Sequence, residues 1–262
     1  MGDIFPRIIR VPVNILVTLI CWSYFIFGYI SFFIPILLIL TPFVQDREAL
    51  FQRVQHLCYR GFFKLLAGIT PGLTFRINDE VRRIRSAVVV ANHRSYLDPI
   101  LLISLFPLQK TIVKGIFFSL PIMRWVMRSG GYIPFVHQGK PNDLMVEGIR
   151  GMEEFLKKGG VFFVFPEGKR SRTGELGPFQ KGAFSIAGKC NAPVEVLYIN
   201  NTDRLFVPGK FFFNTCITNI ISVERLGTVS PGDDHGPGAG KKRDEARMLV
   251  AQRMQKNMAV GK

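Results

Sequence analysis

The sequence predicts an α/β fold with a mainly parallel central sheet flanked by helices, preceded by an N-terminal membrane-embedded helical segment. Two observations predict the sheet. Short apolar runs rich in β-branched and aromatic residues recur at 87–91, 161–165 and 194–199, and segments with helical spacing alternate with them. A third observation predicts the membrane segment, because no charged residue occurs in residues 11–41.

The N-terminal apolar stretch, residues 8–44, is longer than one straight crossing requires. As a single helix, residues 11–41 would be about 45 Å long, against a hydrocarbon core of roughly 30 Å. Gly28, Ser31 and Pro35 lie where a second segment could begin. Two arrangements fit: one crossing followed by an interfacial piece, or a helical hairpin that enters one leaflet and returns. A cleaved signal peptide is a less favoured alternative, because this apolar stretch is longer than the apolar region of a signal peptide. A soluble pair of buried helices is also a less favoured alternative.

The remaining elements follow in order along the chain. Residues 47–68 have the spacing of an amphipathic helix, and 73–77 is a short strand before the strand at 87–91. The later expectations are helices at 99–106, 142–158 and 181–189 and a further strand at 111–113. This pattern divides the chain into an anchoring segment (1–45), an α/β domain (46–229), a linker rich in Gly and Pro (230–240) and a C-terminal helix (241–262) against the domain or the membrane.

Charge and composition limit the classes of molecule that the protein is expected to bind. The chain carries a formal net charge of +15, which implies an anionic partner: nucleic acid, a phosphorylated substrate or an anionic membrane. The basic residues are dispersed and 24 of the 262 residues are Phe, which favours membrane lipids over nucleic acid. The four Cys residues are widely spaced without a CxxC pair, so neither a zinc site nor a disulfide framework is indicated, and we expect no metal.

A first candidate catalytic segment, NHRSYLD, follows the strand at 87–91 and contains His93 and Asp98. Histidine is the side chain best suited to proton transfer near neutral pH, and a nearby carboxylate fixes its tautomer. Five residues place the two groups about 140° apart on a regular helix, which prevents contact, whereas a loop running into a helix start would let them meet. Helix capping is the alternative, either as a Ser95/Asp98 pair or with Asp98 as N-cap before Pro99.

A second segment, FPEGKRSR at 165–172, follows the strand at 161–165. Three cations within four residues, next to Gly and Ser, suit a phosphate, because an Arg guanidinium donates in a planar fork that matches phosphate oxygens. A solvated basic turn is the alternative. Both segments begin where an apolar strand ends, which is where α/β proteins collect their functional groups.

Taken together, these segments resemble the motifs of the glycerolipid acyltransferase family that includes bacterial lysophosphatidate acyltransferase. NHRSYLD resembles the family's NH-x4-D motif and FPEGKRSR its F-P-E-G-T-R-S motif. Residues 114–135 resemble the intermediate motif, and 179–184 and 192–194 resemble the F-x-x-G-A and P-V segments that follow. The resemblance covers residues 85–200 in order and spacing.

The resemblance implies an O-acyltransferase. His93 would be the general base on a lipid hydroxyl, and Asp98 would hold and polarise His93. Arg170 would bind the acceptor phosphate with Glu167 and Gly168 shaping that site, and Lys114 would support the phosphate. Acyl-CoA or acyl-carrier protein would be the acyl donor, with no cofactor, and backbone N–H groups near Gly168 would stabilise the oxyanion. The product would be phosphatidate, made from 1-acyl-glycerol-3-phosphate at the cytoplasmic membrane, with the catalytic domain on the cytoplasmic face.

Four departures from the family pattern bear on the acceptor. Lys169 replaces a Thr, His137 stands where relatives often carry a phosphate-binding Arg, Arg124 lies near the place of a Gly, and Val196 replaces a Pro. A His contact to phosphate would be weaker and dependent on pH. The alternative is therefore the same chemistry on another lyso-acceptor, either a lysophospholipid with a larger head group or a lyso-ornithine-type lipid. A catalytically silent membrane-binding protein is a hypothesis of a different class.

Overall fold

The computed structural model describes residues 6–135, 143–171, 173–230 and 238–260. Its helices are α1 (Arg7–Gly28), α2 (Ile34–Leu40), α3 (Arg47–Ile69), α4 (Asp79–Arg83), α5 (Leu97–Ile103), α6 (Pro121–Ser129), α7 (Asp143–Arg150), α8 (Met152–Lys157), α9 (Gly182–Lys189), α10 (Thr202–Leu205) and α11 (Gly238–Val260). Shorter helical turns are η1 (Tyr29–Phe33), η2 (Thr41–Phe43) and η3 (Gly115–Phe118). The strands are β1 (Leu73–Ile77), β2 (Ala87–Ala91), β3 (Gln109–Lys114), β4 (Ile133–Phe135), β5 (Val161–Val164), β6 (Val194–Asn200) and β7 (Asn219–Val229).

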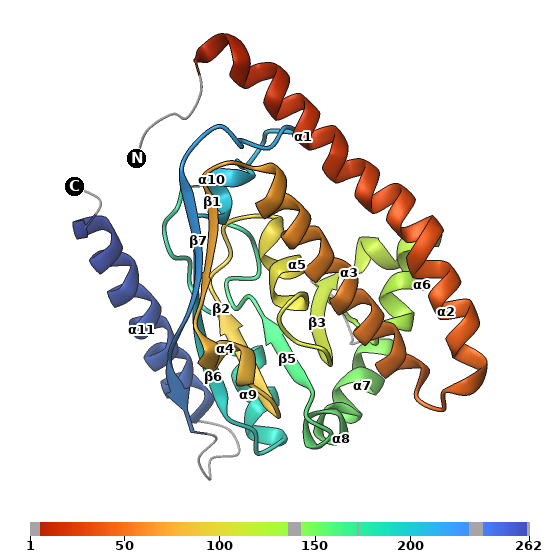
Figure 1. The fold of residues 1–262 in the computed structure, drawn as a ribbon. Helices are drawn as coiled ribbons and strands as arrows, with labels where there is room; N and C mark the ends of the chain where they lie inside the picture. The colour runs from red at the N-terminus through yellow and green to blue at the C-terminus, as the bar shows by residue number, and fades with distance from the viewer. Residues whose placement is uncertain (1–5, 136–142, 172, 231–237, 261–262) are drawn as a thin grey trace.

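One seven-stranded sheet organises the fold, in the order β1-β7-β6-β2-β5-β3-β4 (Figure 1). The pairs within β6-β2-β5-β3-β4 are parallel, whereas β7 pairs antiparallel with β6 and parallel with β1. The expected mainly parallel α/β fold is confirmed. Because β6, β2, β5 and β3 run the same way, their carboxyl ends lie at one edge of the sheet.

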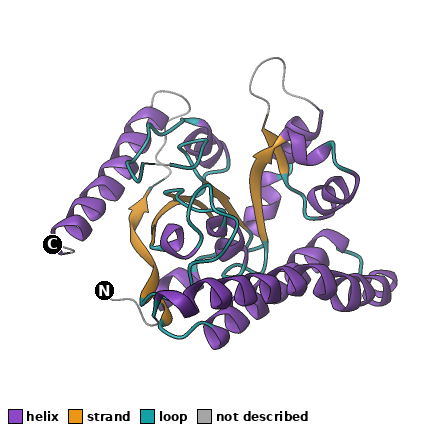
Figure 2. Cartoon of the chain, turned by 90° about the horizontal axis from the view of Figure 1, so that it is seen from above, coloured by secondary structure: helices purple, strands orange, loops and turns teal. Residues whose placement is uncertain are grey.

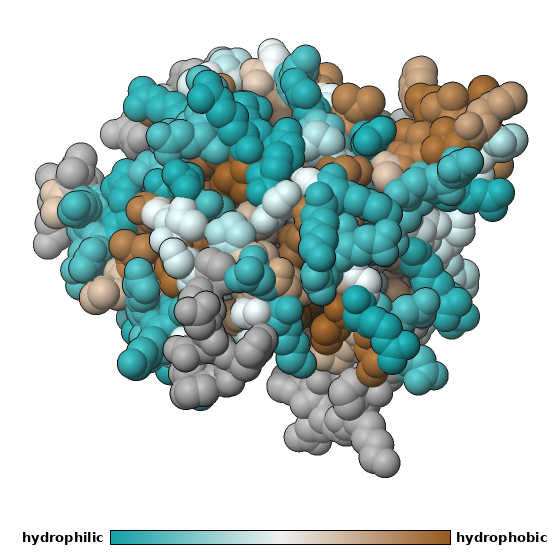
Figure 3. All heavy atoms as spheres, turned by 90° about the horizontal axis from the view of Figure 1, so that it is seen from below, coloured by the Kyte–Doolittle hydropathy of each residue, from teal (hydrophilic) through white to brown (hydrophobic). Residues whose placement is uncertain are grey.

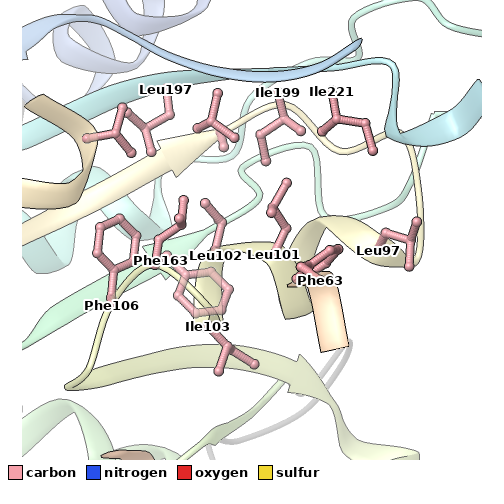
Figure 4. Packing of buried hydrophobic residues seen from close by; sticks show 14 of the residues in the cluster. Phe63, Leu97, Leu101, Leu102, Ile103, Phe106, Phe163, Leu197, Ile199 and Ile221 are labelled. Atoms are coloured by element: carbon pink, nitrogen blue, oxygen red, sulfur yellow. The ribbon is translucent and has the colours of Figure 1, made fainter. Parts of the chain in front are cut away.

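The sheet is buried on both faces, as the apolar runs predict. In β2, Ala87, Val89 and Ala91 pack in one core cluster with α3 and α5, whereas Val88 and Val90 pack in another with α8, α9 and α11. In Figure 4, leucines of α5 face side chains that project from β6 and β7. The C-terminal helix α11 lies against β6, β7 and α9, which settles its placement on the domain.

The N-terminal apolar stretch forms one long helical run that passes through α1, η1, α2 and η2 without a break (Figures 1 and 2). The break expected near Pro35 is absent. A proline interrupts the hydrogen bonding of the preceding turn, and the π-helical turn η1, immediately before α2, accommodates it. The chain then reverses, and α3 returns along α1.

Several boundaries differ from the sequence-based expectation. The single helix expected at 142–158 is two helices, α7 and α8, separated at Gly151, and residue 142 lies outside the described residues. The strand expected at 111–113 is longer, and β4, β7 and α6 were not predicted. Most of the expected linker at 230–240 lies outside the described residues, and α11 begins at Gly238, earlier than residue 241.

Candidate functional site

The two candidate segments meet at the carboxyl-terminal edge of the sheet because β2 and β5 are neighbouring parallel strands. His93 lies two residues beyond β2, and Glu167 lies three residues beyond β5. The loop after β5 is tied to the loop after β2 by a hydrogen bond of 2.8 Å from the Ser171 backbone N–H to the His93 carbonyl. The placement predicted from the two apolar strands is therefore the placement found.

His93 and Asp98 are in direct contact, with 2.9 Å between Nδ1 and Oδ2. Because the partner is a carboxylate, Nδ1 carries the hydrogen and Nε2 is the nitrogen with a free lone pair in the neutral ring. No hydrogen bond to Nε2 occurs within the described residues, and the His93 side chain is 16% exposed. An accessible, oriented imidazole nitrogen of this kind can accept a proton.

Asp98 is completely buried, and both of its carboxylate oxygens accept hydrogen bonds. Besides His93, Oδ2 accepts the backbone N–H groups of Arg94 and Ser95, each at 2.7 Å. Oδ1 accepts the Thr202 hydroxyl at 2.6 Å. Helix α5 begins at Leu97, so Asp98 is not its N-cap and that alternative is wrong. The bond from the Ser95 N–H is one half of the expected capping pair, so the same carboxylate closes the turn and holds His93.

Glu167 positions the backbone of the site. Its Oε1 accepts the His93 backbone N–H at 2.9 Å and its Oε2 accepts the Gly177 N–H at 2.9 Å. Burial raises the pKa of this carboxyl group, and the two backbone hydrogen bonds partly oppose that effect. Both oxygens are thus engaged within the protein, so Glu167 shapes the site by fixing the loop that carries His93.

The His93 ring also has a defined neighbour on its face. Phe165 stacks on it, with 4.2 Å between the ring centroids and 20° between the planes. Phe165 is the first residue after β5, and its placement follows from the pairing of β5 with β2. Aromatic stacking and the Asp98 hydrogen bond together leave the imidazole little freedom to rotate.

Arg170 has unused hydrogen-bonding capacity. Its guanidinium lies 3.8 Å above the Tyr96 ring, and its Nε and Nη1 are buried without a partner among the described residues. Unpaired buried donors on a cation are costly unless a ligand accepts them. Arg94, next to His93, also has a buried Nε without a partner among the described residues, but its Nη2 is paired with Asp203 at 2.8 Å. Arg170 is therefore the side chain best prepared to receive an anion.

The other residues predicted from the sequence are placed as follows. Gly168 has a φ of 68°, a conformation that favours glycine, and its N–H donates to the Phe165 carbonyl at 3.0 Å. That N–H is therefore engaged within the turn, and the expectation that backbone N–H groups near Gly168 stabilise an oxyanion stays a prediction. Lys114 is exposed at the end of β3, on the same sheet edge, and within the described residues it makes no recorded ion pair. His137 lies outside the described residues.

An apolar pocket of about 140 Å³ adjoins this loop. Tyr96, Leu97 and Ile100 of the α5 region line one side, and Trp22 and Phe25 of α1 line another. Tyr96 thus has Arg170 over its ring while its side chain borders an apolar cavity. Over the ranges described, no group of three metal-ligating side chains gathers anywhere.

Comparison with known proteins identifies the relationship. Residues 72–200, which include β1 to β6 and both candidate segments, match the acyltransferase family model. The chain belongs to the acyltransferase family. The family resemblance inferred from the motifs is thereby confirmed, and its matched region ends at the last residue of β6.

Curated relatives and a solved structure agree with this family. The chain is 31% identical to the chloroplastic 1-acyl-sn-glycerol-3-phosphate acyltransferase LPAT1 of Arabidopsis thaliana, over 86% of this chain and 61% of that protein. It is 29% identical to the 1-acyl-sn-glycerol-3-phosphate acyltransferase of Saccharomyces cerevisiae, over 76% of this chain and 66% of that protein. The chain thus spans about three fifths of the plant relative's length.

The crystal structure of the lysophosphatidate acyltransferase PlsC from Thermotoga maritima has the same fold. The match has a TM-score of 0.71 and 23% sequence identity, and it covers 95% of this chain and 98% of that chain. The likeness extends over the N-terminal helices as well as the sheet, because nearly the whole of both chains is aligned.

Sequence reasoning missed three residues of the acyltransferase domain's site. Thr202 contacts Asp98, Phe165 stacks on His93, and Asn92 anchors the end of β2 by bonding both the N–H and the carbonyl of Ile199 at 2.8 Å. Asn92 and Phe165 lie inside the quoted motifs and could have been assigned from them. Thr202 carried no local signal, since its partner is far away in the sequence.

Proposed function

We propose that this protein is an O-acyltransferase that moves a fatty acyl group from acyl-CoA or acyl-carrier protein to the sn-2 hydroxyl of 1-acyl-glycerol-3-phosphate, forming phosphatidate. The observation that carries the proposal is the His93–Asp98 hydrogen bond of 2.9 Å, which leaves Nε2 of a partly exposed ring without a partner among the described residues. Family membership supports the reaction type, and the names of the relatives support the acceptor.

In the proposed reaction, Nε2 of His93 takes the proton of the acceptor hydroxyl as its oxygen attacks the thioester carbonyl. The C–O bond forms, the tetrahedral intermediate collapses and the C–S bond breaks. The leaving thiolate takes the proton back from His93. Asp98 stabilises the imidazolium that forms between these two steps, because its carboxylate contacts Nδ1 and is held in place by hydrogen bonds from Arg94, Ser95 and Thr202.

Arg170 supports a phosphorylated acceptor. Its buried Nε and Nη1 lack partners among the described residues, and an acceptor phosphate would satisfy them. Stacking on Tyr96 fixes the guanidinium plane, so the cation is held in place before a ligand arrives. Lys114, exposed at the end of β3, adds positive charge to the same edge of the sheet. We assign both residues to acceptor binding.

The N-terminal helices support access from a membrane. The run Ile8–Phe43 is the one candidate membrane span in the described chain, and it leaves large apolar side chains exposed along its outer side. Hydrophobic side chains gather at the upper right of the surface in Figure 3, the side on which α2 lies in Figure 1. The inner side packs on the domain from Val17 to Leu37.

A helical run whose inner side packs on its own domain along this length cannot be surrounded by lipid. We therefore infer that the run seats the protein in one leaflet with the catalytic domain at its surface, on the cytoplasmic side of the cytoplasmic membrane. The apolar pocket between α1 and α5 would then lie close to lipid chains.

A panel of acceptors tests the proposal. Purified protein with a single acyl donor is offered lysophosphatidate, a lysophospholipid with a larger head group and a lyso-ornithine lipid. We expect lysophosphatidate to give the highest kcat/KM. The second candidate, another lyso-acceptor, is favoured by His137 at the place of an Arg in relatives. A clear preference for either of the other acceptors would replace the proposed substrate while leaving the reaction type in place.

A further inference from the structure

Helix α10, immediately after β6, reaches the centre of the site from outside the family-matched region. Its first residue, Thr202, is fully buried, and its hydroxyl donates to Asp98 Oδ1 at 2.6 Å. The two residues are 104 positions apart in the chain. The matched region ends at residue 200, so the family motifs do not include this contact.

The two oxygens of the Asp98 carboxylate have different partners. Oδ2 accepts His93 and two backbone N–H groups, whereas Thr202 is the partner of Oδ1 among the described residues. Asp98 is fully buried, so water cannot readily take the place of a lost donor. The Thr202 hydroxyl therefore fixes the rotation of the carboxylate, and that rotation sets the direction in which Oδ2 meets His93 Nδ1.

Helix α10 is itself held firmly at this position. Asn201, which precedes it, has a φ of 62°, and its side chain donates to the Ile220 carbonyl of β7 at 2.8 Å. Asn219 donates to the Asn201 carbonyl at 3.1 Å. Asp203 is paired with Arg94, the neighbour of His93. Thr202 is thus presented by a turn that is bonded both to β7 and to the loop carrying the imidazole.

We propose that Thr202 is a positioning residue that fixes the Asp98 carboxylate and, through it, the orientation of His93. It contacts neither reacting group, so its effect is on the rate of the chemical step and not on substrate affinity. The inference rests on the proposed role of His93 as the general base.

The test compares Thr202→Val, Thr202→Ser and the control Thr215→Val in the full chain. Thr215 is a matched control because it is also buried and donates its hydroxyl to a side-chain oxygen, Asn14 Oδ1 at 2.8 Å, away from the site. We expect Thr202→Val to lower kcat about tenfold to hundredfold with KM nearly unchanged, since a hydrogen bond to a charged group is lost. Thr202→Ser should recover most of kcat, and Thr215→Val should keep it.

A readout independent of turnover is the proton NMR signal of the His93 Nδ1–H, assigned by its absence in His93→Gln. We expect it to shift or broaden in Thr202→Val and to be retained in Thr202→Ser. If Val prevents folding, Thr202→Ala replaces it in both experiments.

Wild-type kcat and an unchanged signal in folded Thr202→Val would overturn the inference, as would an equal loss of kcat in Thr215→Val. If His93→Ala keeps its activity, the proposed function fails instead. The NMR comparison then still decides whether Thr202 orients His93.

Discussion

At the scale of single residues, the imidazole of His93 is fixed by contacts on its edge, its face and its backbone. Asp98 holds Nδ1, Phe165 covers the ring, and Glu167 and Ser171 bond the His93 N–H and carbonyl. These contacts come from the segments that follow β2 and β5, so the orientation of the ring depends on both of these neighbouring strands. Such preorganisation means that small changes in supporting residues should affect the reaction more than stability.

The substitution Glu167→Gln tests whether Glu167 positions His93, because it replaces one carboxylate oxygen with an NH2 group. The Glu167 oxygens accept two backbone N–H groups, from His93 and Gly177. An amide can accept only one of them, and its NH2 group would face the other donor. We expect kcat to fall about tenfold, from a mismatch costing about 1–3 kcal/mol, while the far-UV circular dichroism spectrum stays unchanged. Wild-type kcat in this variant would show that Glu167 does not position His93.

At the scale of elements, the N-terminal helical run has an inner side that packs and an outer side that does not. Phe33 is fully buried and contacts the rings of Phe51 and Trp125, with centroid distances of 5.1 and 6.5 Å. Its neighbour Phe32 is 67% exposed. Two adjacent residues of the same type therefore separate the two roles of the helix.

We expect Phe33→Ala to lower the free energy of unfolding by about 3–5 kcal/mol, because it leaves a cavity beneath η1. Phe32→Ala should leave the Tm in detergent nearly unchanged and reduce binding to lipid vesicles, since one exposed apolar ring no longer enters the lipid. Thermal unfolding and vesicle flotation of both variants measure these effects. Equal losses of Tm would mean that both sides of the run are packed in the protein.

Helix α3 contacts β3 and the turn between α6 and β4 through a buried polar network. Gln55 accepts the Tyr132 hydroxyl and the Gln109 side chain, and Gln52 donates to the Gly130 carbonyl at 3.0 Å. Burial raises the pKa of Tyr132 above its ordinary value, because the phenolate would lose its solvation. The folded state therefore holds this proton more tightly than the unfolded state does.

The sign of the pH dependence follows from that shift. The contribution of Tyr132 to stability is complete below the ordinary Tyr pKa of about 10 and is lost as the pH rises above it. We expect Tyr132→Phe to be less stable than wild type at pH 8 by about 1 kcal/mol. The difference should shrink as the pH is raised towards 11 in urea unfolding experiments. Parallel pH curves for the two proteins would contradict this account.

At the scale of the whole molecule, the sequence predicted the strands that are buried on both faces. β2, β5 and β6 are nearly continuous apolar runs. Such runs can be recognised as buried strands without knowing which strands they pair with. β7 escaped prediction because it includes the charged Glu224 and Arg225 and is partly exposed along its length. β4 is short and contains Pro134, which is tolerated because β4 is an edge strand.

The site shows the same division between local and long-range information. From the sequence, Asp98 could either contact His93 or cap a helix. The choice between these two depends on where helix α5 starts. The hydroxyl of Thr202 could not be predicted, because it reaches Asp98 only once β6 lies beside β2. The unpaired donors of Arg170 likewise depend on how its loop packs over Tyr96.

The most direct measurement of the central claim is the initial rate of acyl transfer to lysophosphatidate by purified wild-type protein and by His93→Ala. We expect the wild type to form phosphatidate and thiol in equal amounts. His93→Ala should lose about 10³-fold or more of that rate with its Tm and vesicle binding preserved. A His93→Ala rate within tenfold of wild type would remove the His93–Asp98 pair from the mechanism, and the absence of acyl transfer by the wild type with any acceptor would contradict the proposed function.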